Sequence, residues 1–116
     1  MKIFATRNNA KNLIISNCKI ADNFVLRILG LLPYKTLSEN DGLLLKPSNS
    51  IHTFFMRMTI DVIFIDKNNK IIKIYHEVKP FRILPIHLNS RCVIETAGGI
   101  CKMKNLQKGD IISFNE

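Results

Sequence analysis

The segment SIHTFFMRMTIDVIFID, residues 50–66, sets polar and charged side chains inside an otherwise apolar run. If the segment is a strand, its side chains alternate between two faces, and one face carries Thr53, Phe55, Arg57, Thr59 and Asp61. An arginine among apolar neighbours needs an anion if it is buried. If it is accessible, its planar fork of N–H donors suits an acidic or hydroxylated ligand. The pattern therefore predicts a candidate ligand-binding face centred on Arg57.

A structural role for the same arginine competes with this interpretation and is favoured, since ion-pair networks often imitate functional sites. Asp61 follows Arg57 by four residues, which is about 13 Å along a straight strand at roughly 3.3 Å per residue and too far for an easy direct pair. Glu95, inside the apolar segment RCVIETAG (residues 91–98), is the other candidate partner. Arg57 therefore meets either an internal carboxylate or a ligand from outside.

The opposite face of the same predicted strand carries His52, Phe54, Met56 and Met58. Histidine and methionine together are ligands suited to copper(I). Methionine more commonly fills gaps in a core, however, and a single histidine on an apolar face is usually hydrogen-bonded there. No further ligand can be placed beside this strand, so we expect core packing and predict neither a metal site nor a cofactor.

The three cysteines, Cys18, Cys92 and Cys101, form no CxxC pair. An odd number without that spacing argues against a disulfide framework and against a structural zinc site, and predicts buried free thiols. The sequence also lacks the GxSxG, HExxH, P-loop and GxGxxG motifs. A pair of Cys92 or Cys101 with His52 or His76 remains an alternative catalytic arrangement.

Short apolar segments rich in branched and aromatic residues must position these side chains. We expect strands at residues 12–20, 42–47, 51–58, 61–66, 71–78, 91–98 and at the end of 105–114. A turn is expected at 66–70, where asparagines tolerate a left-handed backbone, and a proline-containing loop at 79–90.

One segment has helical spacing instead, near residues 22–32, and we expect Asp22 to cap it and Pro33 to end it. Its wide apolar face predicts a buried helix, with a helix lying on a membrane as the alternative. Together the elements predict a mainly β, β-rich α+β fold, a compact sandwich or barrel that includes the jelly-roll type.

The bulk composition suits a single domain spanning residues 1–116, with 47% hydrophobic residues to form a core. No signal peptide and no membrane-spanning apolar run is visible, which predicts a cytoplasmic location. The net charge is +8, and residues 1–37 hold six basic groups but one acid. A binder of nucleic acid or membrane through this basic third is therefore an alternative function. The basic residues are scattered, with no run of three, which argues against nucleic acid as a partner.

Several blocks of the chain resemble the family called domain of unknown function 192, also uncharacterised protein family 0127. The resemblance covers residues 20–114 and rests on RILGLLPYKTL, DGLLL, the long block from residue 50, RCVIETAGG and LQKGDIISF. The residues matching its motif are Phe55, Met56, Arg57, Thr59, Asp61, Glu95, Gly98, Gly109 and Asp110. Phe55 stands where tryptophan is common in the family, and Asn68–Asn69 where Asp-Gly is common. Some relatives carry export signals or membrane anchors, whereas this sequence shows none.

The resemblance implies a compact, mainly β domain and no established biochemical activity. We therefore predict a non-catalytic module that binds a small polar ligand, carbohydrate-like ligands included, or a protein partner. Its candidate contact residues are Phe55, Arg57, Thr59, Asp61 and Glu95. The alternative is an enzyme of unknown reaction that uses Arg57, Asp61 and Glu95. The sequence leaves the oligomeric state open.

Overall fold

The computed structural model describes residues 1–23, 26–27, 30–31 and 34–115. Within these residues the chain forms strands and one short helix. The strands are β1 (Lys2–Arg7), β2 (Ala10–Ile15), β3 (Asn17–Ala21), β4 (Asp41–Leu45), β5 (Ile60–Asp66), β6 (Ile71–Val78), β7 (Ser90–Ala97) and β8 (Ile111–Asn115), and the helix is α2 (Ile100–Met103).

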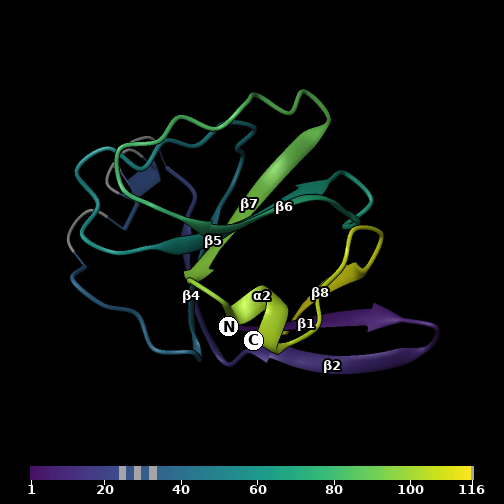
Figure 1. The fold of residues 1–116 in the computed structure, drawn as a ribbon. Coiled ribbons are helices and arrows are strands. Elements are labelled where there is room, and N and C mark those ends of the chain that lie inside the picture. The colour runs from purple at the N-terminus through teal and green to yellow at the C-terminus, as the bar shows by residue number, and fades with distance from the viewer. Residues whose placement is uncertain (24–25, 28–29, 32–33, 116) are drawn as a thin grey trace.

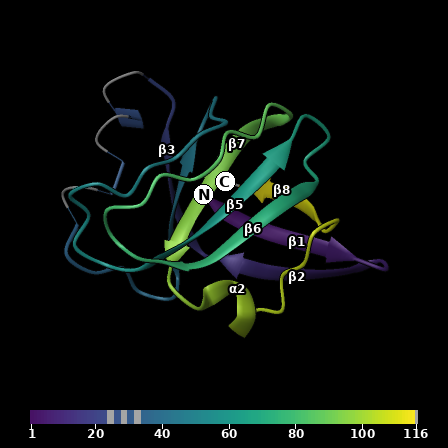
Figure 2. The same ribbon diagram turned by 45° about the horizontal axis from the view of Figure 1, so that its top comes forward.

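The strands form two sheets, which Figures 1 and 2 show from two directions. One sheet has the order β2-β1-β8 and the other the order β3-β4-β7-β5-β6. All neighbours are antiparallel except β3 and β4, which run parallel. A parallel pair needs a crossover connection, and residues 22–40 provide it. The arrangement is a sandwich and not a closed barrel, which confirms the first of the two predicted architectures.

The five-stranded sheet is covered on both faces, by different material. Its inner face packs on the three-stranded sheet through a cluster that includes Ile3, Ile15, Leu44, Ile63, Ile94 and Ile112. Its other face is covered by connecting segments through a second cluster that includes Leu31, Ile51, Met56, Val62, Phe64, Leu84 and Val93. In Figure 1 these segments lie on the side of the sheet away from β1, β2 and β8. The sheet therefore carries apolar residues on both faces, as the continuous apolar runs in its strands require.

The single strand expected at 12–20 is wrong, because the chain changes sheets at Ser16. Ile3 pairs with Ile15 and Phe4 with Leu13, so Ile14 is an extra residue on β2. Such a bulge bends a strand and disturbs its alternation, and Ile14 and Ile15 are both buried. The apolar residues of segment 12–20 predict one continuous strand and give no local sign of this bend.

The strand expected at 51–58 is also wrong. This segment is a loop whose pairing is a single isolated bridge between His52 and Ile83. Phe55 has a φ of 64°, in the left-handed region that a continuous strand does not visit. The predicted faces therefore fail: Met56 is buried but His52 is exposed, and Thr53 is buried although it should share a face with exposed Phe55.

The predicted hairpin is confirmed. β5 and β6 pair across a turn in which the Asn69 N–H donates to the Asp66 carbonyl over 3.0 Å. Asn69 has a φ of 63°, which asparagine tolerates. The Asp66 side chain accepts hydrogen bonds from the N–H groups of Asn68 and Lys70. In the turn before β8, Gly109 has a φ of 96°, which glycine adopts without strain.

The helix predicted near residues 22–32 lies largely outside the described residues, because 24–25, 28–29 and 32–33 are not described. Among its described residues, the Arg27 N–H donates to the Asn23 carbonyl and the Gly30 N–H to the Leu26 carbonyl, which is α-helical spacing. The side chain of Asn23 accepts from the Leu26 N–H over 2.9 Å. Asn23 therefore caps this segment, one residue later than the predicted Asp22.

Candidate functional site

Buried Thr53 links two loops, residues 51–59 and residues 79–84, through hydrogen bonds. Its N–H donates to the Arg82 carbonyl over 2.8 Å, and its carbonyl accepts from the Phe81 N–H over 3.0 Å. Its hydroxyl donates to the Lys79 carbonyl over 2.7 Å and accepts from the Arg82 N–H over 2.9 Å. One side chain thus satisfies backbone groups of a segment that belongs to no sheet. Residues 51–59 and 79–84 therefore form one structural unit.

Large apolar side chains stand exposed on this unit. Phe55 is 75% exposed, Phe81 59% and Ile83 72%. The rings of Phe55 and Phe81 meet edge to face with centroids 5.9 Å apart, and both residues have a φ of 64°. Two non-glycine residues in this strained region cost about 1–3 kcal/mol each, and such strain concentrates at functional sites. The fold therefore holds two aromatic rings at the surface at a cost in stability.

Arg57 and Arg82, which neighbour these phenylalanines in the sequence of the same two loops, are exposed as well. We call the set Phe55, Arg57, Phe81, Arg82 and Ile83 the loop-tip patch. The sequence around it carries no acid, neither in residues 46–60 nor in 79–94. Among the described residues Arg57 makes no ion pair. None of their carboxylates is therefore the internal partner that a buried Arg57 would need. The patch combines apolar groups with positive charge.

Asp61 is a structural residue of β5. Its side chain is fully buried, and its two carboxyl oxygens accept three backbone hydrogen bonds. Oδ1 accepts from the Glu77 N–H over 2.8 Å and from the Gly99 N–H over 3.1 Å. Oδ2 accepts from the Cys101 N–H over 2.8 Å. This carboxyl joins the end of β6 and the start of α2 to β5.

Glu95 lies on the other face of the five-stranded sheet. It pairs with Val62 across the ladder, whereas Asp61 pairs with Thr96, and cross-strand partners share a face. Glu95 is 1% exposed, and no described residue makes a hydrogen bond to its Oε2. Burial raises the pKa of its carboxyl to about 8. The structure therefore separates Asp61 from Glu95 and brings neither together with exposed Arg57.

Thr59, at the end of the exposed loop, is positioned by Gly98. The Gly98 N–H donates to the Thr59 carbonyl over 3.2 Å. A Cβ added at Gly98 would lie 3.1 Å from Thr59 Cγ2 and 3.2 Å from the Thr59 oxygen. The close approach favours a residue without a side chain, because a Cβ there would push Thr59 away by a few tenths of an ångström.

Gly98→Ala is therefore expected to lower stability by about 1–3 kcal/mol, the usual cost of overpacking, measured by urea unfolding. Adding Thr59→Ser removes the methyl contact but leaves the contact with the backbone oxygen, so the double variant should recover only part of the loss. Full recovery would show that the side chain alone demands the glycine, and no loss in Gly98→Ala would contradict the close approach.

The three cysteines are buried free thiols, as predicted. Burial raises the pKa of Cys18 to about 11 and raises the pKa of Cys92 as well. The pKa of Cys101 is also raised, first by burial and then by the nearby Asp61. A nucleophilic cysteine needs a lowered pKa, so these thiols have the environment of core residues.

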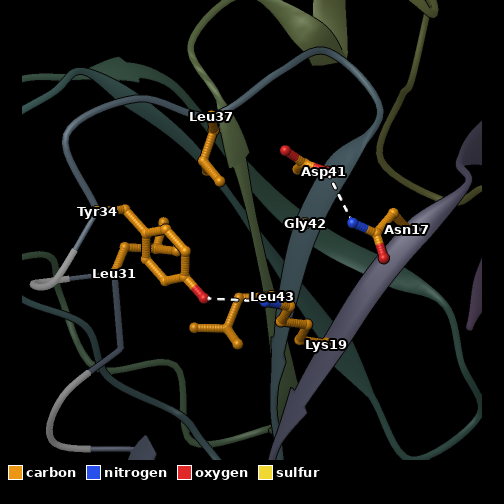
Figure 3. A pocket seen from close by; sticks show the side chains of 8 residues that line it. All are labelled: Asn17, Lys19, Leu31, Tyr34, Leu37, Asp41, Gly42 and Leu43. Atoms are coloured by element: carbon orange, nitrogen blue, oxygen red, sulfur yellow. Dashed lines mark hydrogen bonds between the residues drawn. The ribbon is translucent and has the colours of Figure 1, made fainter.

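A small pocket beside β3 and β4 is too small for an organic ligand. It has a volume of about 60 Å³, and typical ligand sites have several hundred. Figure 3 shows its lining: Asn17, Lys19, Leu31, Tyr34, Leu37, Asp41, Gly42 and Leu43. The Asn17 amide donates to Asp41 over 2.9 Å, and Lys19 Nζ lies 3.4 Å from the Tyr34 hydroxyl. The polar groups at this pocket already have partners.

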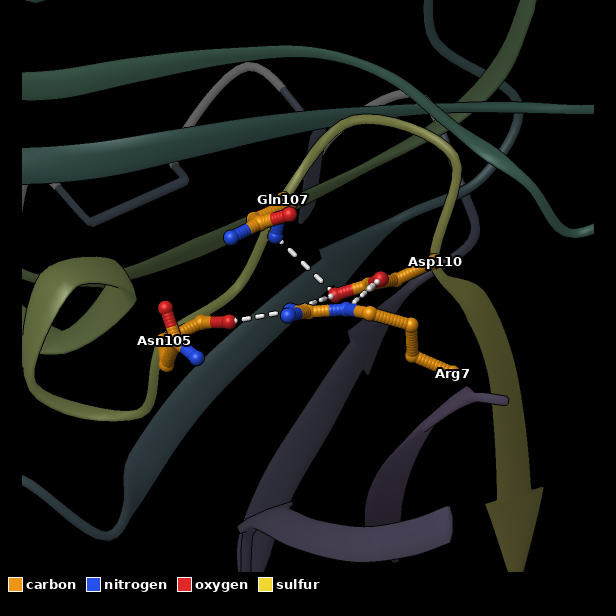
Figure 4. A network of polar contacts seen from close by, with 4 residues as sticks. All are labelled: Arg7, Asn105, Gln107 and Asp110. Atoms are coloured by element: carbon orange, nitrogen blue, oxygen red, sulfur yellow. Dashed lines mark hydrogen bonds and ion pairs between the residues drawn. The ribbon is translucent and has the colours of Figure 1, made fainter. Parts of the chain in front are cut away.

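The charged pair at the other end of the sandwich anchors the turn before β8 (Figure 4). Arg7 donates through Nε to Asp110 Oδ1 over 2.7 Å and through Nη2 to Oδ2 over 3.0 Å. Asp110 Oδ2 also accepts from the Gln107 N–H, and Arg7 donates to the Asn105 carbonyl. The hydrogen bond from Arg7 lowers the pKa of the Asp110 carboxyl. One of the six basic residues in the first 37 is therefore engaged within the fold.

Sequence reasoning named Thr53, Phe55 and Arg57 but missed Phe81 and Ile83. The available signal was the segment KPFRILPIHL at 79–88, which keeps large apolar residues between prolines without strand or helix periodicity. Such a segment cannot bury all of them through regular pairing. Contact between 79–84 and 51–59 is long-range, and no local pattern encodes it.

Comparison with known proteins agrees with this fold. A UPF0127 protein of Pyrococcus horikoshii is 35% identical over 111 residues, covering 92% of this chain and 96% of the relative. A UPF0127 protein of Pyrococcus furiosus is 31% identical, with 84% and 85% covered.

Two crystal structures share the fold at low identity. One is a Novosphingobium aromaticivorans protein of unknown function, with a TM-score of 0.85, 17% identity and coverage of 97% of this chain and 84% of that one. The other is a Sinorhizobium meliloti protein described as a candidate transcription regulator, with a TM-score of 0.84, 16% identity and coverage of 97% and 91%.

No helix in the described part of the chain has the length and apolar character to cross a membrane. The model of the family DUF192, described as "Uncharacterized ACR", matches residues 4–114, nearly the whole length. That match agrees with the relatives in covering both sheets and the loop unit. The chain therefore belongs to the DUF192 family.

Proposed function

We propose that this protein is a non-catalytic binding module that docks through the loop-tip patch onto a partner combining apolar groups with negative charge. The observation that carries the proposal is the exposed Phe55–Phe81 pair, held by strained backbone next to Arg57. Exposed aromatic residues and arginine are the types that dominate binding energy at interfaces. The acid-free loops favour a negatively charged partner.

The alternative of an enzyme that uses Arg57, Asp61 and Glu95 has less support. A general acid or base must lie within hydrogen-bond reach of the group it serves. Asp61 is occupied by three backbone N–H groups, and Glu95 lies buried on the opposite face of the sheet. These positions favour structural roles for both carboxyls.

Amide shifts of ¹⁵N-labelled protein can test the proposal with three probes. These are an acidic peptide of alternating glutamate and leucine, anionic phosphatidylglycerol vesicles, and a neutral maltooligosaccharide. We expect the peptide or the vesicles to perturb or broaden signals of residues 51–59 and 79–84. Phe55→Ser and Phe81→Ser should each weaken that binding about tenfold or more, which is about 1.4 kcal/mol.

The matched control is Met103→Ser, which removes an exposed apolar side chain from α2. It should leave binding unchanged. Response to the oligosaccharide alone would overturn the charge requirement, and absence of any response at these loops would overturn the patch itself. Equal weakening by Met103→Ser would show general stickiness instead of a defined surface.

A further inference from the structure

A groove of about 500 Å³ opens between the two sheets at the β3–β4 end of the sandwich. Its lining comprises Met1, Ile20, Asp22, Leu44, Lys46, Pro47, Arg91, Cys92 and Phe114. The groove arises because three strands cannot cover the inner face of five, and β3 is an edge strand of the larger sheet. Its volume lies in the range of small-molecule sites.

The floor of the groove is part of the core. Leu44 and Cys92 are 4% and 6% exposed and belong to the cluster between the sheets. Phe114, partly buried, packs against the same cluster, and Ile20 remains 40% exposed. An apolar chain laid in this groove would remove these surfaces from water, at about 25 cal/mol per Å² buried.

Two positive charges stand at the mouth. Lys46 follows β4 and Arg91 lies in the neighbouring β7, and both side chains are exposed. Both residues line the same groove as Cys92 of its floor. Asp22 also lines the groove and is the one acid among its described lining residues. Among the described residues neither cation is in an ion pair.

We propose that this groove binds a small anionic amphiphile, an acyl chain with a carboxylate head, with the chain over Leu44 and Phe114 and the head between Lys46 and Arg91. Apolar surface explains why the ligand carries a chain, and two cations that make no ion pair with any described residue explain why its head is negative. This site shares no residue with the loop-tip patch, so it stands independently of the proposed function.

Titration with decanoate below its micelle concentration tests the site, with methyl signals of Ile20 and Leu44 as the readout. Saturable shifts are expected at these methyls, with decan-1-ol binding at least about tenfold more weakly. Lys46→Gln and Arg91→Gln should each weaken decanoate binding several-fold and leave decanol binding unchanged. Lys104→Gln, which removes an exposed lysine at a different cavity, should bind decanoate normally, and so should Phe81→Ser.

Three outcomes would overturn the site. If decanoate and decanol bound equally, and neither Lys46→Gln nor Arg91→Gln changed their binding, the two cations would not recognise a carboxylate head. Shifts confined to other methyl groups would show that decanoate does not bind in this groove. Self-association at the concentration used, with Ile20 shifts that follow protein concentration and not decanoate, would show that a second copy fills it.

Discussion

Replacing Asp61 with alanine should destabilise the protein by about 3–5 kcal/mol, the usual cost of leaving buried partners of a carboxyl group unmatched. The side chain is fully buried and accepts hydrogen bonds from the N–H groups of Glu77, Gly99 and Cys101. Alanine leaves all three donors without that acceptor. Asp61→Asn should cost less, about 2–4 kcal/mol, because one carboxyl oxygen becomes an amide donor that faces another donor. Urea unfolding measures both.

Asp66→Asn is the matched control at the other end of the same strand. Its Oδ1 accepts two backbone N–H groups in an exposed turn, and asparagine retains an equivalent oxygen, so the cost should stay below about 1 kcal/mol. If Asp61→Asn behaved like Asp66→Asn, Asp61 would not be a structural junction and the catalytic interpretation would regain support.

Replacing Glu95 with glutamine should flatten the dependence of stability on pH. Burial raises the pKa of this carboxyl from its ordinary value of 4.5 to about 8. Between these values the folded protein keeps a proton that the unfolded chain has lost, so stability falls as pH rises. Its contribution is fully present below about pH 4.5 and is lost as pH passes about 8. At about 1.36 kcal/mol per pH unit, the fall approaches a ceiling of about 5 kcal/mol, and neutral glutamine removes it.

Urea unfolding of both proteins at intervals from pH 5 to 9 measures this difference. The range avoids the acid region in which the lowered pKa values of Asp41 and Asp110 matter. Exposed Glu39→Gln should retain the slope of the wild-type protein. Parallel curves for wild type and Glu95→Gln would mean that Glu95 is ionised when folded and has an ionic or hydrogen-bonding partner.

Two residues of the candidate site, Phe55 and Arg57, were predicted from the sequence, but the strand from which they were predicted does not exist in the structure. Alternation along a strand selected Phe55 and Arg57, and both are exposed, with the Phe55 ring against the Phe81 ring of the second loop. The segment is a loop, however, because Thr53 directs its backbone hydrogen bonds to residues 79–82. Branched and aromatic residues suit a strand, yet one long-range contact overrides such a preference. Asp61 and Glu95 were named as candidate partners of Arg57. Only the pairing of β5 with β7 shows that the two carboxyls lie on opposite faces of the sheet.

The sequence by itself determined the β-rich class, the β5–β6 hairpin and the buried thiols. These features depend on local alternation, on turn residues with a left-handed backbone, and on composition, which are all readable over a few neighbouring positions. Tertiary structure alone decided the division of 12–20 between two sheets, the union of the loops at Thr53, and the groove at the β3–β4 end. Each depends on contacts between distant segments, whose partners no local pattern specifies. The exposure of Arg57 depends in the same way on the hydrogen bonds of Thr53 to residues 79–82, which make its segment a loop and not a strand.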